Sequence, residues 1–303
     1  MLRRKKFKLR LPVAADLPSR TLALGERTLV MGILNVTPDS FSEGQLFSKG
    51  LFLDVDATVA RALEIERAGA DILDIGGEST RPGAEPISVE EELSRVVPVL
   101  DKLRGRLKIP ISIDTSKLEV AFAAANRGVA IVNDVTGLRA DPRLAELAAE
   151  RKLPLILMHM RREPRTMQKK PFARDVMRDV FAGLRRSVAI ARRAGVAKSQ
   201  IVVDPGIGFG KSTQQNFELL ARLPELARFG FPLLIGTSRK GFIGKALGGA
   251  AENERAWGTA ATVAASILGG AHIVRVHDVA EMVQVVRVAD AIANPRVIAS
   301  NRC

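Results

Sequence analysis

The sequence is poor in the residues that most often build thiol and metal centres. Its only cysteine is Cys303, the last residue, and its 303 residues include three histidines, one tryptophan and no tyrosine. A lone cysteine excludes an internal disulfide and a cysteine-ligated metal cluster, and at this position it is no ordinary nucleophile. No His, Asp and Glu spacing typical of a tight zinc site occurs. Thiol chemistry is therefore not expected.

Long apolar runs are also missing. No run reaches the roughly 18 to 20 residues that span a bilayer. The first ten residues, MLRRKKFKLR, are basic, but they lack the apolar centre of a secretory signal. We expect a cytoplasmic protein with no membrane segment, in which the leading basic cluster is a polar tail.

Acidic residues are scarcer than basic ones, since 33 Asp and Glu stand against 46 Lys and Arg, which gives a net charge of +13. This balance favours anionic partners such as phosphates or nucleic acid. The arginines, however, are spread over helix-like segments such as Arg185-Arg186 and Arg192-Arg193, where a solvated face is expected. Few aromatic rings accompany them to stack on bases. Nucleic acid is therefore not expected as a partner.

Hydrophobic residues make up 47% of the chain, and they recur in short runs. Eight runs, nearly all separated by segments of helix length, lie at 29–34, 72–75, 111–113, 130–132, 155–158, 201–204, 232–235 and 271–274. This alternation predicts an α/β fold, a single-domain (β/α)8 TIM barrel over residues 29–295. Residues 1–28 would form the basic tail and a hairpin that turns at Gly25-Glu26. A doubly wound open sheet is the alternative, because the number of strands does not show closure.

Polar side chains follow the apolar runs at seven places, namely Asn35, Asp114, Asn133, His159, Asp204, Ser238 and Arg275. One such residue can be a helix cap and nothing more. Seven of them match the face on which barrel enzymes carry their chemistry, which favours the barrel and predicts a ligand site there. His272 lies inside the last run and is expected to be structural.

The run at 201–204 opens into DPGIGFGKS, in which three closely spaced glycines let a ligand approach the main chain. Its end, Gly210-Lys211-Ser212, is similar to a phosphate-binding nucleotide loop. The first glycine of such a loop would have to stand where Pro205 does, so the match fails by one residue. We expect a site here, but not a nucleotide loop.

The polar set suits a flat heterocycle next to an anion. Asp114, Asn133 and Asp204 supply two carboxylates and an amide for a ring that has both donors and acceptors. Arg275 and His277 are two residues apart, point to one side of an extended segment and would form a pair of cations for a diphosphate. The sequence also allows a weakly held Mg2+ that bridges the phosphate and an Asn or Asp side chain, because such an ion needs few protein ligands.

The segments that carry these residues resemble dihydropteroate synthase, in order from about residue 30 to 280. They are MGILNVTPDSFS at 31–42, DIGGESTRPGA at 74–84, ISIDTSK at 111–117, VNDVTG at 132–137, LILMHM at 155–160, VVDPGIGFGKS at 202–212, PLLIGTSRKGFIG at 232–244 and AHIVRVHDV at 271–279. The resemblance implies a (β/α)8 barrel, usually a homodimer, in folate biosynthesis. Such an enzyme joins 6-hydroxymethyl-7,8-dihydropterin diphosphate to 4-aminobenzoate, which sulfonamides imitate, and releases pyrophosphate with Mg2+ present.

The resemblance also implies a role for each matching residue. The pterin would be held by Asp114, Asn133, Met158, Asp204 and Lys240. The diphosphate would be bound by Arg275, by His277 and, through Mg2+, by Asn35. The aminobenzoate would lie among Thr80, Arg81, Pro82, Phe209 and Ser238, with Phe41 closing the site. The catalytic residues would be Asp114, Lys240, Arg275 and His277, and Asp114 would stabilise positive charge on the pterin.

Two loops depart from the family pattern. The first reads SEGQLF at 42–47 where Asp-Gly-Gly is usual, and Arg161-Arg162-Glu163 replaces a small pair that includes glycine. We expect changed loop motion more than lost chemistry, and a catalytically weak paralogue is one alternative. A pterin-dependent methyltransferase is another, but it has no use for an anion site at Arg275 and His277. A non-catalytic scaffold would explain the charge but not the polar strand ends.

The order of binding is also predicted. Without diphosphate, Arg81 would lie near Lys240 and Arg275 with nothing to offset their mutual repulsion. We therefore expect the aminobenzoate pocket to form only after a diphosphate with Mg2+ has bound.

Overall fold

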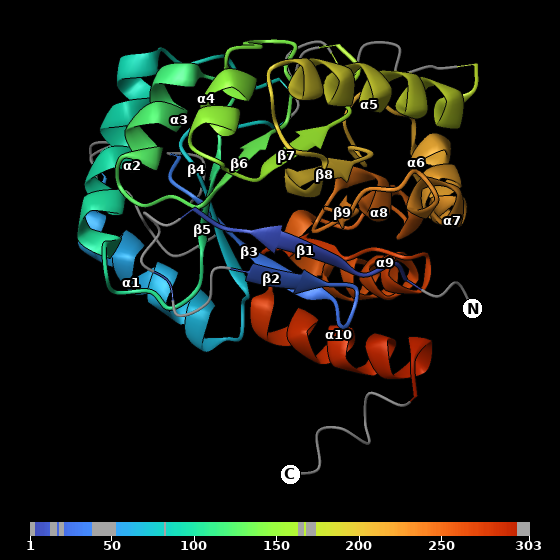
Figure 1. Ribbon diagram of the computed structural model, residues 1–303. Helices are drawn as coiled ribbons and strands as arrows, with labels where there is room; N and C mark the ends of the chain where they lie inside the picture. The colour runs from blue at the N-terminus through green and yellow to red at the C-terminus, as the bar shows by residue number, and fades with distance from the viewer. Residues whose placement is uncertain are drawn as a thin grey trace.

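The structure is a computed structural model, and it describes residues 4–12, 17, 21–37, 53–81, 83–162, 167 and 174–295. Eight parallel strands are hydrogen-bonded in the order β8-β7-β6-β5-β4-β3-β10-β9. Their bounds are β3 Leu29–Asn35, β4 Ile72–Gly76, β5 Ile111–Asp114, β6 Ile131–Asp134, β7 Leu155–Met158, β8 Ile201–Asp204, β9 Leu234–Ile235 and β10 Ile273–Val276. A parallel bridge between Val203 and Leu233 joins the two ends of this order. The predicted barrel is confirmed, and the doubly wound alternative is wrong (Figure 1).

Helices follow the strands and surround the barrel (Figure 1). They are α1 Val55–Arg67, α2 Val89–Leu103, α3 Leu118–Ala125, α4 Leu144–Glu150, α5 Val176–Arg193, α6 Thr213–Ala221, α7 Leu223–Ala227, α8 Gly241–Ala246, α9 Ala256–Leu268 and α10 Val279–Ala293, with the 3-10 helices η3 Lys198–Gln200 and η4 Glu252–Glu254. Side-chain caps at Asp54, Ser88, Asp175 and Ser212 accept main-chain N–H groups that a first helical turn leaves unpaired. Within the described part of the chain, every helix is too short or too polar to cross a membrane.

Most of the core lies between the barrel strands and the apolar faces of the helices. Gly32 of β3 shows how closely the two layers approach, because a Cβ at this position would come within 2.4 Å of Ile65 Cγ2 on α1. A side chain there would force the helix away from the strand. The barrel wall is therefore fixed by packing on its outer side, which leaves the carboxyl ends of its strands to carry polar residues.

A short antiparallel pair, β1 Phe7–Arg10 and β2 Thr21–Leu24, covers the amino-terminal end of the barrel (Figure 1). Leu9 and Leu24 share a core cluster there with the first residues of several barrel strands. The predicted hairpin turn at Gly25-Glu26 is wrong, because β2 forms its antiparallel pair with β1, which precedes it in the chain, and not with the residues that follow Glu26. Gly25 instead takes a φ of +91° and lies against the Lys5 carbonyl, in a bend that leads into β3.

The basic cluster near the start of the chain is tied to the barrel and is not, at Arg4, the polar tail that we expected. Arg4 forms an ion pair with Asp290 of α10, and the two side chains are 7% and 6% exposed. Asp290 also accepts from the main-chain N–H of Thr28 at 2.6 Å. His272 is structural, as predicted, since its Nδ1 accepts from the Leu233 N–H at 3.1 Å. Its Nε2 lies 3.0 Å from the Lys5 carbonyl.

Candidate active site

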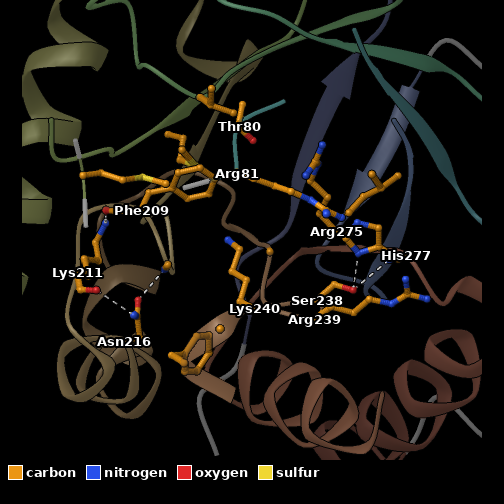
Figure 2. A pocket seen from close by; sticks show the side chains of 18 of the residues that line it. Thr80, Arg81, Phe209, Lys211, Asn216, Ser238, Arg239, Lys240, Arg275 and His277 are labelled. Carbon is orange, nitrogen blue, oxygen red and sulfur yellow. Dashed lines mark hydrogen bonds between the residues drawn. The ribbon is translucent and has the colours of Figure 1, made fainter. Parts of the chain in front are cut away.

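A cavity of about 1080 Å³ opens at the carboxyl ends of the barrel strands (Figure 2). Twelve residues predicted for the site line it, namely Asn35, Thr80, Arg81, Asp114, Asn133, Met158, Asp204, Phe209, Ser238, Lys240, Arg275 and His277. The other two predicted residues, Phe41 and Pro82, lie outside the described residues. His159 also follows a strand, but it is buried and does not line the cavity. The strand-end residues therefore converge on one space.

Arg275 of β10 lies between two aspartates of neighbouring strands. Its Nε donates to Asp74 Oδ2 at 2.6 Å, and its Nη2 donates to Asp114 Oδ2 at 2.7 Å. Asp74 Oδ2 also accepts from Asn133 Nδ2 at 3.1 Å. The fully buried carboxylate of Asp74 thus holds both Asn133, which was predicted to bind the pterin, and Arg275, which was predicted to bind the diphosphate. Sequence reasoning missed Asp74, although a charged residue inside the apolar strand ILDIG was a signal for it.

Burial raises the pKa of the two aspartates predicted to bind the pterin. The pKa of Asp114 rises to about 7 through burial, which outweighs the attraction of Arg275 and is reinforced by Asp74. Burial also raises the pKa of Asp204, while Lys240 and the Gly206 N–H lower it. That N–H donates to Asp204 Oδ1 at 2.7 Å. A ligand that donates hydrogen bonds to these carboxylates would offset the loss of their hydration.

Lys240 points into the cavity between Phe209 and Arg275 (Figure 2). Its Nζ donates to the Ile207 carbonyl and lies 4.5 Å from the centre of the Phe209 ring. Burial lowers the pKa of Lys240 to about 8, although Asp204 acts to raise it. The main chain and an aromatic ring therefore hold this cation at the boundary between the predicted pterin wall and the predicted diphosphate end.

His277 is anchored by Ser238 and is not the second cation that we predicted. Ser238 Oγ accepts from the main-chain N–H of His277 at 3.1 Å and lies 2.9 Å from its Nδ1. The hydroxyl proton can donate to Nδ1, which places the ring proton on Nε2. Burial, and then the positive charges of Arg239 and Arg275, lower the pKa of His277 well below 6.5. The pair is one guanidinium cation and one neutral imidazole.

Arg81 has a counter-ion in the ligand-free protein. Its Nη2 lies 3.0 Å from Glu252 Oε1 of η4, and the two side chains are 47% and 39% exposed. Both residues line the cavity. The expected repulsion with nothing to offset it is therefore wrong, because Glu252 supplies a negative charge at the cavity rim.

The base of the segment that carries Thr80 and Arg81 is tied down more firmly than its tip. Glu78 accepts from the Ile87 N–H at 3.0 Å and from Lys117 Nζ at 2.9 Å. Lys117 in turn donates to the fully buried Glu92 of α2 at 2.6 Å. The aminobenzoate side of the predicted site thus stands on a network of ion pairs behind β4 and β5.

Of the two loops that depart from the family pattern, residues 42–47 lie outside the described residues. At the other loop, Arg162 takes a φ of +64°. This left-handed conformation is the one that glycine adopts without strain. The replacement thus changes the side chains at this rim, while the main chain at Arg162 keeps a left-handed conformation that glycine would adopt without strain.

Known proteins match the chain over most of its length. Residues 31–277 match a protein family described as pterin binding enzyme. A dihydropteroate synthase of Synechocystis is 50% identical over 268 residues, which cover 88% of this chain and 91% of that relative. The chain belongs to the dihydropteroate synthase family.

Solved structures of this family agree with the fold. The dihydropteroate synthase of Xanthomonas albilineans with 4-aminobenzoic acid has a TM-score of 0.84 at 42% identity, over 96% of this chain and 99% of that one. The enzyme of Yersinia pestis in complex with a sulfonamide drug has a TM-score of 0.84 at 42% identity, over 91% and 98%.

Proposed function

We propose that this chain catalyses the family's reaction, in which 6-hydroxymethyl-7,8-dihydropterin diphosphate and 4-aminobenzoate give 7,8-dihydropteroate and pyrophosphate. The observation that carries the proposal is a cavity with two buried carboxylates and an amide at one end, Arg275 and His277 at the other, and Lys240 at the boundary between them. A ring that donates and accepts hydrogen bonds fits the first group, and a diphosphate fits the second.

The pterin would bind among Asp114, Asn133, Asp204 and Lys240. Carboxylates accept from its ring N–H and amino groups, while the Asn133 amide can both donate and accept. Met158 is 4% exposed at the cavity wall and belongs to an apolar cluster against which Phe209 packs, so it offers a face for the flat ring. Removal of any one of these polar groups would leave a ligand atom without its partner.

The diphosphate would bind to Arg275 and to Nε2 of His277. Two nitrogens of Arg275 are used by Asp74 and Asp114, so its Nη1 would face the ligand oxygens. Among the described residues, no group of three or more His, Cys, Asp or Glu side chains could hold a metal ion. A Mg2+ that arrives on the diphosphate fits this donor set, because it needs few protein ligands. The amide oxygen of Asn35 at the cavity wall would bind it, and the ion would neutralise charge on the leaving group.

The aminobenzoate would lie between Thr80, Arg81, Phe209 and Ser238, and Phe41 and Pro82 would complete its pocket. Arg81 would pair with the carboxylate in place of Glu252, since a guanidinium binds one carboxylate as well as another. Phe209 would provide an apolar wall beside the benzene ring.

The reaction breaks the bond between the pterin methylene carbon and a diphosphate oxygen, and the electron pair of that bond leaves with pyrophosphate. The aminobenzoate nitrogen forms the new bond to the carbon and loses a proton. Arg275 and His277 would stabilise the departing negative charge, and Asp114 would stabilise positive charge on the ring. The remaining task of the site is to hold both reactants in line.

Pyrophosphate release by the purified chain, with both substrates and Mg2+ supplied, tests the proposal. We expect release that requires aminobenzoate, together with dihydropteroate detected by mass spectrometry. Normal binding with very slow release would identify the catalytically weak paralogue. Methyl transfer to or from a reduced pterin, without pyrophosphate release, would identify the methyltransferase and contradict the proposal.

We further propose that the chain is a homodimer. The outer face of α9 carries a row of exposed apolar side chains, namely Trp257, Ala261, Ala265 and Leu268. Trp257 is 87% exposed, and Val288 on the adjacent α10 is 62% exposed. An apolar surface of this kind is typical of a protein interface. Light scattering should give twice the chain mass, and Val288→Lys should shift it to the monomer; a wild-type monomer would contradict the proposal.

A further inference from the structure

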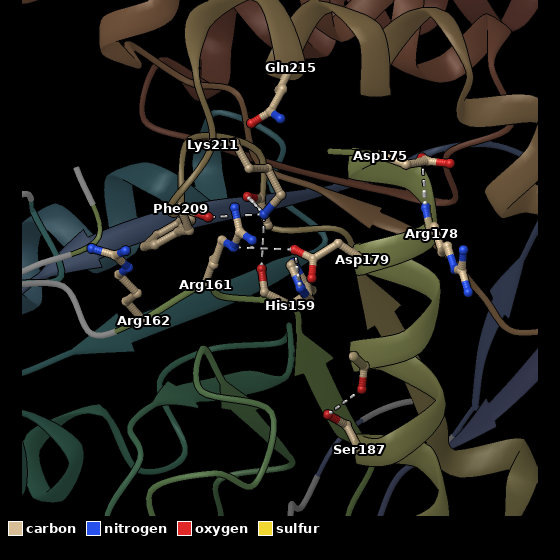
Figure 3. Close-up of polar contacts among 12 residues, drawn as sticks. His159, Arg161, Arg162, Asp175, Arg178, Asp179, Ser187, Phe209, Lys211 and Gln215 are labelled. Carbon is tan, nitrogen blue, oxygen red and sulfur yellow. Dashed lines mark hydrogen bonds and ion pairs between the residues drawn. The ribbon is translucent and has the colours of Figure 1, made fainter. Parts of the chain in front are cut away.

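Lys211 is a buried lysine whose Nζ bonds to three main-chain carbonyls, and burial lowers its pKa to about 7. The residue is 3% exposed. Its Nζ donates to the carbonyls of Gly206 at 2.7 Å, Phe209 at 3.0 Å and His159 at 3.2 Å (Figure 3). An ammonium group has three N–H donors. No donor is therefore left for a ligand, although Lys211 lies at the cavity wall.

The two segments that Lys211 joins are stacked at very short range. A Cβ on Gly206 would come within 2.0 Å of the His159 carbonyl oxygen, and one on Gly210 within 2.3 Å of the Arg161 carbonyl oxygen. Gly206 and Gly210 have φ values of +65° and +66°, which glycine adopts without strain. The segment after β7 therefore lies directly on the loop after β8, and the Lys211 ammonium is inserted between their carbonyls.

The loop after β8 has the opposite electrostatics to the nucleotide loop that its sequence resembles. In a nucleotide loop, main-chain N–H groups face an anion. Here the carbonyls of Gly206 and Phe209 face the Lys211 ammonium, and the carbonyl of Ile207 accepts from Lys240. The conformation of this loop therefore depends on two lysines and not on a bound phosphate.

Two residues of the proposed site depend on this conformation. Phe209 belongs to the loop, and its carbonyl is one of the three that Lys211 holds. Lys240 is held both by the Ile207 carbonyl and by the face of the Phe209 ring. From the far side, Asn216 of α6 accepts from the Gly208 N–H at 2.6 Å. A shift of the loop would move Phe209 and with it the support of Lys240.

We propose that Lys211 is a positioning residue that sets the place of Phe209, and through it the aminobenzoate pocket. The inference rests on the proposed function, in which Phe209 forms a wall of the aminobenzoate pocket. Lys211 contacts no substrate in this scheme, because the main chain uses all three of its protons. Its contribution is to keep three carbonyls paired at a place where water has no access.

Kinetics of Lys211→Met and Lys211→Gln test the proposal. Methionine fills the space of the lysine stem without any donor, whereas glutamine keeps two N–H donors in one amide. We expect the KM for aminobenzoate to rise about tenfold or more for Met, and less for Gln, with a smaller effect on kcat through the weakened support of Lys240. Circular dichroism would show whether Lys211→Met folds. If it does not, the KM of Lys211→Gln still tests the proposal.

A double substitution separates positioning from a general loss of stability. In a Phe209→Ala background, Lys211→Gln should change the KM for aminobenzoate by less than about twofold, because the wall that it positions is already gone. Losses that simply add, or an unchanged KM in both Lys211 variants, would overturn the proposal.

The matched control is Lys198→Met, which removes the same charge from an exposed lysine of η3 outside the cavity. It should keep the wild-type KM. A wild-type chain that releases no pyrophosphate would refute the proposed function. Wild-type turnover together with unaffected Lys211 variants would refute only the positioning role.

Discussion

Arg275 of β10 and Asp74 of β4 form a buried ion pair past the intervening strand β3, with 2.6 Å between Nε and Oδ2. Asp74 is fully buried, and the Arg275 side chain is 20% exposed toward the cavity. Asp114 takes a second nitrogen of the same guanidinium. Two carboxylates and one cation thus meet at the point where the pterin and diphosphate ends of the proposed site join, so the orientation of Arg275 is set before any ligand binds.

Asp74→Ala should destabilise the fold, because it leaves the Arg275 guanidinium with one buried partner in place of two. Loss of one member of a buried pair costs about 3 to 5 kcal/mol. The double variant with Arg275→Ala should cost less than the sum of the two single variants, since each single variant already removes the contact between Asp74 and Arg275. Urea unfolding of the three variants would measure this, and strictly additive losses would show that the two side chains are not coupled.

Arg275→Ala and His277→Ala should weaken pyrophosphate binding by different amounts. Each residue would give the anionic diphosphate a charge-assisted hydrogen bond worth about 1.5 to 3 kcal/mol, but Arg275 also carries a full positive charge that the neutral His277 ring lacks, so the loss should be larger for arginine. The affinity for a pterin without diphosphate should fall much less in both variants. Calorimetric titration of both ligands checks this, and equal losses for the two ligands would place these residues elsewhere.

Asp204→Ala and Asn133→Ala should abolish pterin binding while the chain remains folded. Each substitution leaves ligand atoms unpaired at a cost of about 1 to 3 kcal/mol or more. Asn133 also bonds to Asp74, so its variant should lose some stability that the Asp204 variant keeps. Titration of a pterin analogue into the folded variants decides the matter, and unchanged affinity in both would refute the assignment.

The barrel could be predicted because its signal is local, since each apolar strand ends at a polar residue and all strand ends of a barrel meet on one face. The pairing of β2 with β1 could not, because ten residues separate the two strands and a pairing over that distance is not set by a short turn signal.

Asp74 and Glu252 were missed because their partners are distant in sequence. Asp74 and Arg275 are 201 residues apart, and Arg81 and Glu252 are 171 apart. Lys211 attracted notice only through its likeness to a nucleotide loop. Its role depends on main-chain carbonyls, which carry no sequence signal because every residue has one.

His272 makes the stability of the fold depend on pH. Burial lowers its pKa from 6.5 to about 4, whereas the ring takes up a proton near pH 6.5 in the unfolded chain. The folded state therefore has its full stability above pH 6.5 and loses up to about 3 kcal/mol as the pH falls from there through 4. His272→Gln, which keeps one acceptor and one donor, should lose less stability over this range. Urea unfolding at several pH values tests this, and identical pH profiles would contradict it.

Glu252→Gln should change the order in which ligands bind. In the ligand-free protein Glu252 pairs with Arg81, so an incoming aminobenzoate carboxylate must displace it. A bound diphosphate would not remove that competitor, but it adds negative charge close to Lys240 and Arg275 and so favours closure of Arg81 over the site. Wild-type protein should therefore bind aminobenzoate or a sulfonamide only in the presence of Mg2+ and pyrophosphate.

With glutamine at position 252 the competitor has no charge, and weak binding without pyrophosphate should become measurable. The gain should be small, within about fivefold, because an exposed ion pair is worth at most about 1 kcal/mol. Arg81→Ala should abolish the coupled binding, and Glu254→Gln on the same short helix serves as the control for a change of charge. Calorimetry with and without Mg2+ and pyrophosphate would measure each case. Tight binding of aminobenzoate to the empty wild-type protein would show that the carboxylate of Glu252 does not compete and that no order exists.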